Sequence, residues 1–206
     1  MPQWWPSSST ADPVRRVPWT LTIAWTALVG VLLPVYWLHY GPANFLWGSD
    51  IALLLVLASL WTGRALPNSM MAIGVLPFEL VWLADLLSGA QLLGVTAYMF
   101  EAGRPAILRL LSLFHVALPV VIIFLLQRLG YDLRALPAQV ALTWIVLPVT
   151  YLITDPADNI NFAFGPGRAP QQALDPRLYL AIVMVALPLA VTWPAHLLLR
   201  RLLPPP

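Results

Sequence analysis

Ionisable residues lie inside the hydrophobic runs of this chain. They are Asp50, Glu79, Asp85 and His115, and a serine, Ser49, directly precedes Asp50. Charged groups are costly inside a bilayer and rarely face lipid, so these positions are the first place to look for function. A serine hydroxyl activated by a histidine that a carboxylate orients is a nucleophilic catalyst. We therefore expect Ser49 and His115 to be catalytic, with Asp50 or Asp85 orienting the histidine.

The composition is that of an integral membrane protein. Of the 206 residues, 60% are hydrophobic and only 10% are charged, whereas about 25% are charged in ordinary soluble domains. The net charge of +2 is too small and too dispersed for the basic face of a nucleic-acid-binding protein. The chain has no cysteine, which excludes disulfides, thiolate nucleophiles and cysteine-ligated metals. The expected partners are membrane lipid and a lipid-like substrate, and not nucleic acid.

Six stretches are apolar enough to cross a bilayer, which takes roughly 20 residues. They cover about residues 19–39, 42–61, 68–87, 106–129, 137–154 and 178–199. Five of them contain a proline, which removes a backbone donor and predicts a kink: Pro34, Pro77, Pro119, Pro148 and Pro188. The sequence thus predicts an all-α fold, a polytopic six-helix transmembrane bundle with proline-kinked helices.

The remaining segments complete the predicted topology. A polar tail, 1–18, precedes a single transmembrane domain, 19–203, and an outer loop, 155–177, precedes the last helix. Residues 91–100 are apolar but too short to cross, so we expect an interfacial or re-entrant segment there.

Arginine positions predict the orientation in the membrane. One side would hold seven arginines, namely Arg15, Arg16, Arg64, Arg128, Arg134, Arg200 and Arg201. The other side would hold four, namely Arg104, Arg109, Arg168 and Arg177. Under the positive-inside rule both termini are predicted to be cytoplasmic, in a bacterial inner membrane.

The candidate catalytic residues have similar predicted depths. Ser49 lies seven residues into the second stretch and His115 nine residues into the fourth, roughly 11 Å and 14 Å from the same surface at 1.5 Å per residue. A pocket in the outer half of the bundle would bring them together. Ser112, one helical turn before His115, is a second candidate nucleophile.

Other polar residues near the outer side are expected to bind the substrate: Asn44, Glu79, Ser112, Asp155, Asp158, Asn159 and Asn161. Several belong to the segment TDPADNINFAFGPG (154–167), whose short polar side chains are typical of Asx turns. Its spacing is not that of a calcium loop, because the glutamate at the twelfth position is absent. The three histidines are predicted at different depths, which argues against a zinc site. We expect no metal and no cofactor.

Parts of the chain resemble the androgen-induced membrane lipid hydrolases and the YwaF-like six-helix bacterial proteins with their acyltransferase relatives. The likeness rests on FLWGSDIALLL (45–55), LFHVALPVVI (113–122) and, more weakly, NINFAFG (159–165). It implies an intramembrane hydrolase or acyltransferase acting on a lipid ester or acyl group. Ser49 would take the place of the family nucleophile and His115 that of the catalytic histidine. The pattern also resembles uncharacterised bacterial membrane-associated proteins, for which it implies no activity.

Two other functions stay open. Asp50, Glu79, Asp85 and His115 would serve equally as the proton- or cation-binding path of a carrier or sensor. Polar residues that only hold helices together would make the protein a membrane scaffold. A Ser49 hydroxyl beside His115 in a lipid-sized cavity favours the enzyme, whereas a polar track from Asp85 through Glu79 to the inner side favours transport.

Overall fold

The computed structural model describes residues 17–203 except residue 168, and all regular structure in that part is helical. The α-helices are α1 (Trp19–Tyr40), α2 (Gly48–Thr62), α3 (Ala65–Gly74), α4 (Leu76–Leu87), α5 (Ala106–Ser112), α6 (Phe114–Leu129), α7 (Ala135–Ile153), α8 (Pro176–Leu187) and α9 (Trp193–Leu202). Shorter turns are η2 (Pro42–Leu46), η3 (Ala97–Phe100), η4 (Pro156–Asp158), η5 (Ile160–Phe162) and the π-helical η6 (Pro188–Thr192). The predicted all-α class is confirmed, while most of the predicted polar tail, 1–18, lies outside the described residues.

Several helices have the length and apolar character of membrane spans. Four segments qualify in the described part, Trp19–Tyr40, Ala106–Leu129, Ala135–Ile153 and Pro176–Leu202, and α3 with α4 makes a fifth if that pair is one bent span. The predicted six spans are not confirmed. The second predicted stretch yields only the 15-residue α2, and the third is divided into two helices bent by 52°.

Local backbone chemistry explains both differences. Gly41 ends α1 with a φ of +76°, a conformation that favours glycine, and the chain then runs through η2 before α2 begins. Pro77 lies in the first turn of α4, where its missing N–H costs no helical hydrogen bond. The chain therefore bends at Val75, between α3 and α4, instead of continuing one helix through the proline. The other predicted kink positions lie inside α1, α6 and α7 or at the start of η6.

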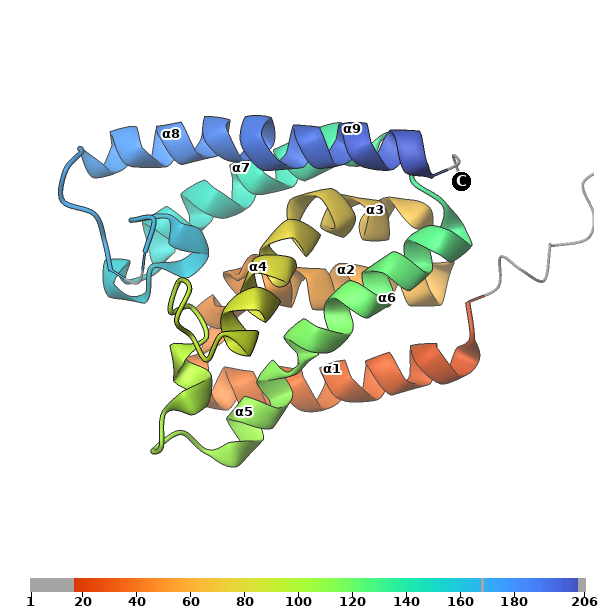
Figure 1. Cartoon of the computed structure of the whole chain (residues 1–206), viewed down its shortest axis with the longest axis horizontal. Coiled ribbons are helices and arrows are strands. Elements are labelled where there is room, and N and C mark those ends of the chain that lie inside the picture. The colour runs from red at the N-terminus through yellow and green to blue at the C-terminus, as the bar shows by residue number, and fades with distance from the viewer. Residues whose placement is uncertain (1–16, 168, 204–206) are drawn as a thin grey trace, which may run out of the picture.

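The main core forms where α3 packs against α2, α6 and α7 (Figure 1). Its fully buried side chains include Leu53, Met71, Ile73, Leu118 and Ile122. Two buried side chains also join helices to backbone carbonyls: Trp25 Nε1 donates to Leu53 O at 3.1 Å, and Asn68 Nδ2 donates to Ile122 O at 3.1 Å. The helices around the core are therefore fixed by hydrogen bonds as well as by apolar packing.

The last two helices lie along α7 at one side of the molecule (Figure 1). Many of their apolar side chains are exposed, among them Leu178, Ile182, Val185, Leu189 and Leu198. Continuous apolar surface of this kind suits contact with lipid. Tyr131 Oη lies 2.7 Å from His196 Nδ1, and this buried hydrogen bond links α9 to the segment that follows α6.

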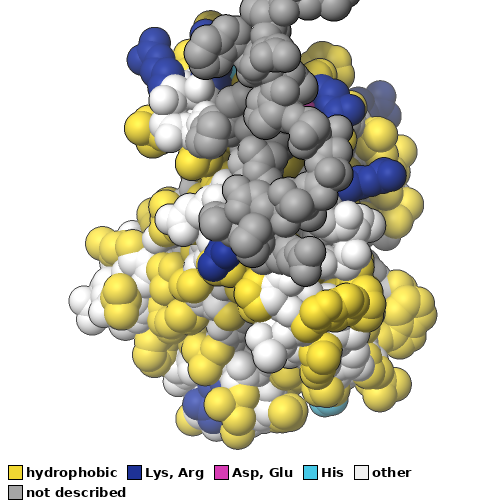
Figure 2. Space-filling model, turned by 90° about the vertical axis from the view of Figure 1, so that its right-hand side faces the viewer, with side chains coloured by type: hydrophobic (Ala, Val, Ile, Leu, Met, Phe, Trp, Pro, Cys, Tyr) yellow, Lys and Arg dark blue, Asp and Glu magenta, His cyan; other side chains and the backbone are white. Residues whose placement is uncertain are grey.

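Both ends of the described chain lie at the same end of the molecule (Figure 1). Figure 2 faces that end, where arginine side chains are dispersed among hydrophobic ones. The turn between α2 and α3, the segment between α6 and α7, and the end of α9 reach it (Figure 1). The opposite end carries η2, the segment 88–105 and the loop after α7, and these surround the candidate site.

Candidate functional site

A cavity of about 830 Å³ opens between α2, α4, α6, α7 and α8. That volume falls in the range of small-molecule binding sites, roughly 300–1,000 Å³. Its wall is mostly apolar, but its acidic and basic side chains are Asp50, Glu79, Arg104 and His115. Ser49 also lines it, so the cavity holds both residues of the predicted catalytic pair.

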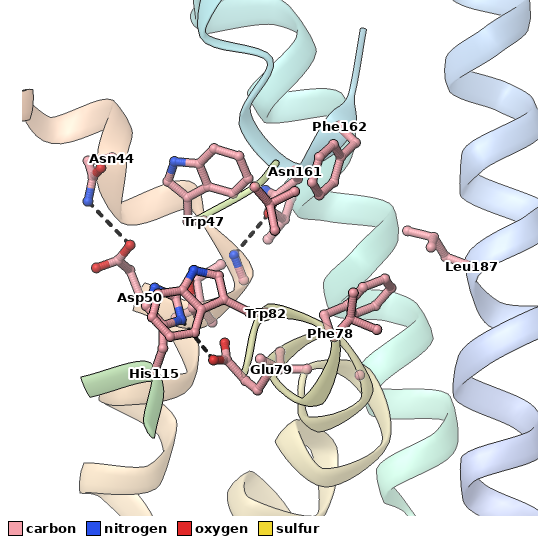
Figure 3. A pocket seen from close by; sticks show the side chains of 18 of the residues that line it. Asn44, Trp47, Asp50, Phe78, Glu79, Trp82, His115, Asn161, Phe162 and Leu187 are labelled. Carbon is pink, nitrogen blue, oxygen red and sulfur yellow. Dashed lines mark hydrogen bonds and ion pairs between the residues drawn. The ribbon is translucent and has the colours of Figure 1, made fainter. Parts of the chain in front are cut away.

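His115 is held in place from three sides. Its Nδ1 is 2.7 Å from Glu79 Oε2, and the two side chains are only 13% and 4% exposed. The imidazole ring stacks on Trp82 at 4.4 Å between centroids (Figure 3). On Phe114 it stacks at 4.1 Å. The carboxylate fixes which nitrogen faces it, and the two rings fix the ring plane. Such an imidazole presents its other nitrogen, Nε2, in a defined direction, as a general base requires.

The first turns of two helices supply these groups. Glu79 lies in the first turn of α4 and Trp82 follows three residues later, so both point from the same helix face. His115 and Phe114 begin α6. The site therefore depends on where the bend before α4 places that helix against α6.

The carboxylate bonded to His115 is Glu79, and neither Asp50 nor Asp85, the orienting residues expected from the sequence, bonds to it. The sequence predicts Glu79 as a substrate-binding residue or as part of a proton- or cation-binding path. Asp85 follows Glu79 by six residues, a rotation of about 240° around the helix, and so points elsewhere.

Asp85 has a structural role instead. It is fully buried and does not line the cavity. Its carboxylate accepts four hydrogen bonds, from Leu93 N at 2.7 Å, Gly94 N at 3.1 Å, Thr96 N at 2.8 Å and Thr96 Oγ1 at 2.7 Å. These bonds hold the segment 88–96 against α4. The segment expected to be interfacial or re-entrant, 91–100, is thus a looped chain ending in η3, and it places Leu93, Val95 and Tyr98 on the cavity wall.

Asp50 and Ser49 enter the cavity from the first turn of α2. Asp50 Oδ2 accepts a hydrogen bond from Asn44 Nδ2 at 3.2 Å, whereas its buried Oδ1 has no partner. Within the described residues Ser49 makes no hydrogen bond to His115. Ser49 lines the cavity wall, and its hydroxyl forms no side-chain hydrogen bond within residues 17–203, residue 168 excepted.

Two more of the predicted residues line the cavity with partners of their own. Asn161 ties the outer loop to the start of α2, because its Oδ1 accepts from Gly48 N at 2.9 Å and its Nδ2 donates to Leu46 O at 2.6 Å. Ser112 Oγ donates to Leu108 O at 2.9 Å and lies 3.0 Å from Tyr36 Oη. The bonded Ser112 hydroxyl is a poorer candidate nucleophile than Ser49.

Three other residues of the outer loop lie away from the cavity. Asp155 caps η4 by accepting from Ala157 N at 2.8 Å, and Asp158 is exposed. Asn159 is buried, and its Nδ2 donates to the carbonyls of Gly165 and Gly167 at 2.9 and 2.7 Å. These residues shape the loop, as Asx-turn chemistry predicts, and none of them lines the cavity.

The sequence did not single out several side chains on the wall. Arg104 Nη1 donates to Tyr40 Oη at 2.7 Å, its Nη2 is 3.2 Å from Glu101 Oε2, and its guanidinium lies 5.0 Å from the Tyr98 ring centre. Burial raises the pKa of Tyr98 to about 12, so its phenol stays neutral. Gln139 also lines the cavity, and it could have been predicted from the sequence because it is a polar residue within the apolar stretch 137–154. Nothing in the sequence marks Trp82 as a partner of His115.

Gly74 lets Gln139 reach the cavity wall from α7. A methyl group at Gly74 would lie 2.8 Å from Gln139 Cγ and closer still to its amide. We expect Gly74→Ala to push Gln139 aside and destabilise the fold by about 1–3 kcal/mol, as overpacked cores do. Thermal unfolding in detergent measures this. Gly30→Ala in α1 is the matched control, since nothing lies within 4 Å of the added methyl; an equal shift in both variants would contradict the prediction.

Together, a fixed imidazole, a serine and an aspartate with one unpaired oxygen line one largely apolar cavity. This arrangement suits proton transfer. No group of three His, Cys, Asp or Glu side chains in the described residues is arranged to hold a metal ion. Comparisons with protein-family models, curated proteins and solved structures give no match.

Proposed function

We propose that the protein is an intramembrane hydrolase or acyltransferase that acts on a lipid ester or acyl group. His115 is its general base, Glu79 positions His115, and Ser49 is the nucleophile. The observation that carries the proposal is the 2.7 Å contact between His115 Nδ1 and Glu79 Oε2 on a cavity wall shared with Ser49. The resemblance of the segments around Ser49 and His115 to membrane lipid hydrolases and acyltransferases implies the same chemistry.

The proposed reaction has two matching steps. His115 takes the Ser49 proton as Ser49 Oγ bonds to the acyl carbon, and it returns that proton to the departing alcohol as the ester bond breaks. Water, or the hydroxyl of a second lipid, then attacks the acyl-serine with the same proton transfers. Water yields a free acid and a lipid hydroxyl yields a new ester, and Ser49 is regenerated in both cases.

Access from the membrane supports a lipid substrate. Phe78 and Val81 on α4 line the cavity and are nevertheless 40% and 45% exposed. The facing wall is formed by apolar residues of α7 and α8, including Leu147, Val183 and Leu187. An acyl chain fits an apolar opening of this kind better than a polar metabolite does.

The carrier or sensor has less support. Its path would run from Asp85 through Glu79 to the inner side, but Asp85 is bonded to the segment 88–96 outside the cavity. A pure scaffold gives no reason for an unpartnered Asp50 oxygen inside a cavity.

The long apolar helices are those of an integral membrane protein. We propose a bacterial inner membrane as its location, with the end of the molecule in Figure 2 on the cytoplasmic side. Arg64 and Arg134 directly precede α3 and α7, and Arg128, Arg200 and Arg201 lie in the last turns of α6 and α9. The positive-inside rule supports this orientation.

Labelling by a fluorophosphonate, which reacts with activated serines, tests the nucleophile. We expect the purified full chain in detergent to be labelled, Ser49→Ala to lose the label, and Ser112→Ala to keep it. Parallel assays of mixed lipid esters should show hydrolysis only in the proteins that label. Labelling that survives Ser49→Ala removes Ser49 from the proposed role, and loss confined to Ser112→Ala assigns the role to Ser112.

A further inference from the structure

We infer that the cavity binds an amphiphile with a cationic amine at its polar end, and that Asp50 holds the amine. The lipid-like nature of the ligand rests on the proposed function. The amine restricts the lipids that the site accepts to those with a cationic head group. The ligand chain would lie toward α7 and α8.

Asp50 is the first reason. It is only 4% exposed, and it lines the cavity. Asn44 donates to its Oδ2, but its buried Oδ1 has no protein partner. A buried carboxyl oxygen without a hydrogen-bond partner is costly, and an ammonium N–H would supply the missing bond and favour the ionised carboxylate.

Asp50 is an acidic side chain of the cavity wall that has no basic partner among the described residues. His115 is paired with Glu79, and Arg104 is paired with Glu101. Among residues 17–203, residue 168 excepted, no arginine or histidine forms an ion pair with Asp50. A cationic ligand group would give Asp50 the charged partner that it lacks, whereas an anionic group would meet a carboxyl group with no compensating base.

Aromatic rings also line the cavity. Tyr36, Trp47 and Trp82 line it together with Asp50, and Trp47 is braced edge-on against Phe162 at 6.0 Å between centroids. Aromatic faces attract cations, and groups of such rings are the usual binding sites for quaternary ammonium ions. These rings favour an ammonium group over a neutral hydroxyl as the partner of Asp50.

The opposite end of the cavity is apolar. Figure 3 shows Asn44 and Asp50 at one end and Leu187 at the other. Leu142, Val146 and Val183 extend the apolar end along α7 and α8. An amphiphile with its amine at Asp50 would pass His115 before its chain reaches α8, which brings a bond near its head group to the proposed base.

Binding of matched twelve-carbon probes tests the inference without any need for turnover. Dodecylammonium, whose N–H groups can donate to Asp50, and dodecanol are titrated into the purified full chain in a neutral detergent. Tryptophan fluorescence is the readout because Trp47 and Trp82 line the cavity. We expect the ammonium probe to bind at least about tenfold more tightly than the alcohol, in line with a cation–aromatic contact and a carboxylate partner. Asp50→Asn should abolish that preference. The control, Asp158→Asn, removes one exposed acid outside the cavity and should retain it.

Equal affinity of the wild-type protein for the two probes would overturn the inference, and this comparison needs no variant to fold. A preference that survives unchanged in Asp50→Asn, with circular dichroism as for the wild type, would also overturn it. Methylammonium binding as tightly as dodecylammonium would overturn the inference that the ligand is an amphiphile. Ester hydrolysis is measured on the same samples. A preference for the ammonium probe without any ester hydrolysis counts against the proposed function alone. Ester hydrolysis without that preference counts against the amine-binding inference alone.

Discussion

Replacing His115 by alanine should reduce ester hydrolysis by about 10²–10⁴-fold, the usual contribution of a positioned general base. The imidazole is fixed by Glu79 and by two stacked rings, so neither water nor a neighbouring side chain can take its place in the same geometry. Rates on p-nitrophenyl acyl esters in detergent micelles measure the loss. His39→Ala is the matched control, because His39 is exposed and bonds only to the carbonyl of Val35.

Added imidazole separates a chemical role of His115 from a packing role. We expect free imidazole to restore part of the activity of His115→Ala, since the variant leaves space beside Trp82 for the small molecule. Glu79→Gln should lower kcat with little change in KM, because Glu79 acts through His115. Full loss of activity in His115→Ala without any rescue, together with a loss of thermal stability, would show that the residue serves only the fold.

Asp85→Ala should destabilise the protein by about 2–4 kcal/mol, since removing a buried acceptor leaves its donors without partners. The carboxylate receives four hydrogen bonds, and the two from Thr96 are buried. Thermal unfolding in detergent measures the change in stability. Proteolysis between residues 88 and 105 should become faster, because those bonds hold the segment against α4.

Asp85→Asn supplies the graded comparison. Its single carbonyl oxygen can keep some of the bonds, so its loss of stability should fall between those of the wild type and Asp85→Ala. The matched control is Asp158→Asn, which should leave stability unchanged because Asp158 is exposed. Wild-type stability in Asp85→Ala would mean that the segment 88–96 is held by its other contacts.

Composition and hydrophobic length predicted the helical class and the membrane character, because both depend on apolar side chains that are local in the sequence. The same signals overestimated the number of long, continuous membrane-spanning helices at two places. Gly41 and Pro42 predict a boundary followed at once by a helix, but the chain passes through η2 first. Pro77 was expected to kink one helix, and it instead begins a second one after a 52° bend.

Sequence reasoning also predicted that Ser49, Asp50 and His115 would share a depth, and all three line one cavity. Depth follows from the residue count along a helix, which the sequence contains. The rotation of each helix about its own axis, and the bend between two helices, are set by packing against distant segments. For that reason only the tertiary structure decided that Glu79, and neither Asp50 nor Asp85, faces His115, that Asp85 holds the segment 88–96, and that Asp50 keeps an oxygen without a partner.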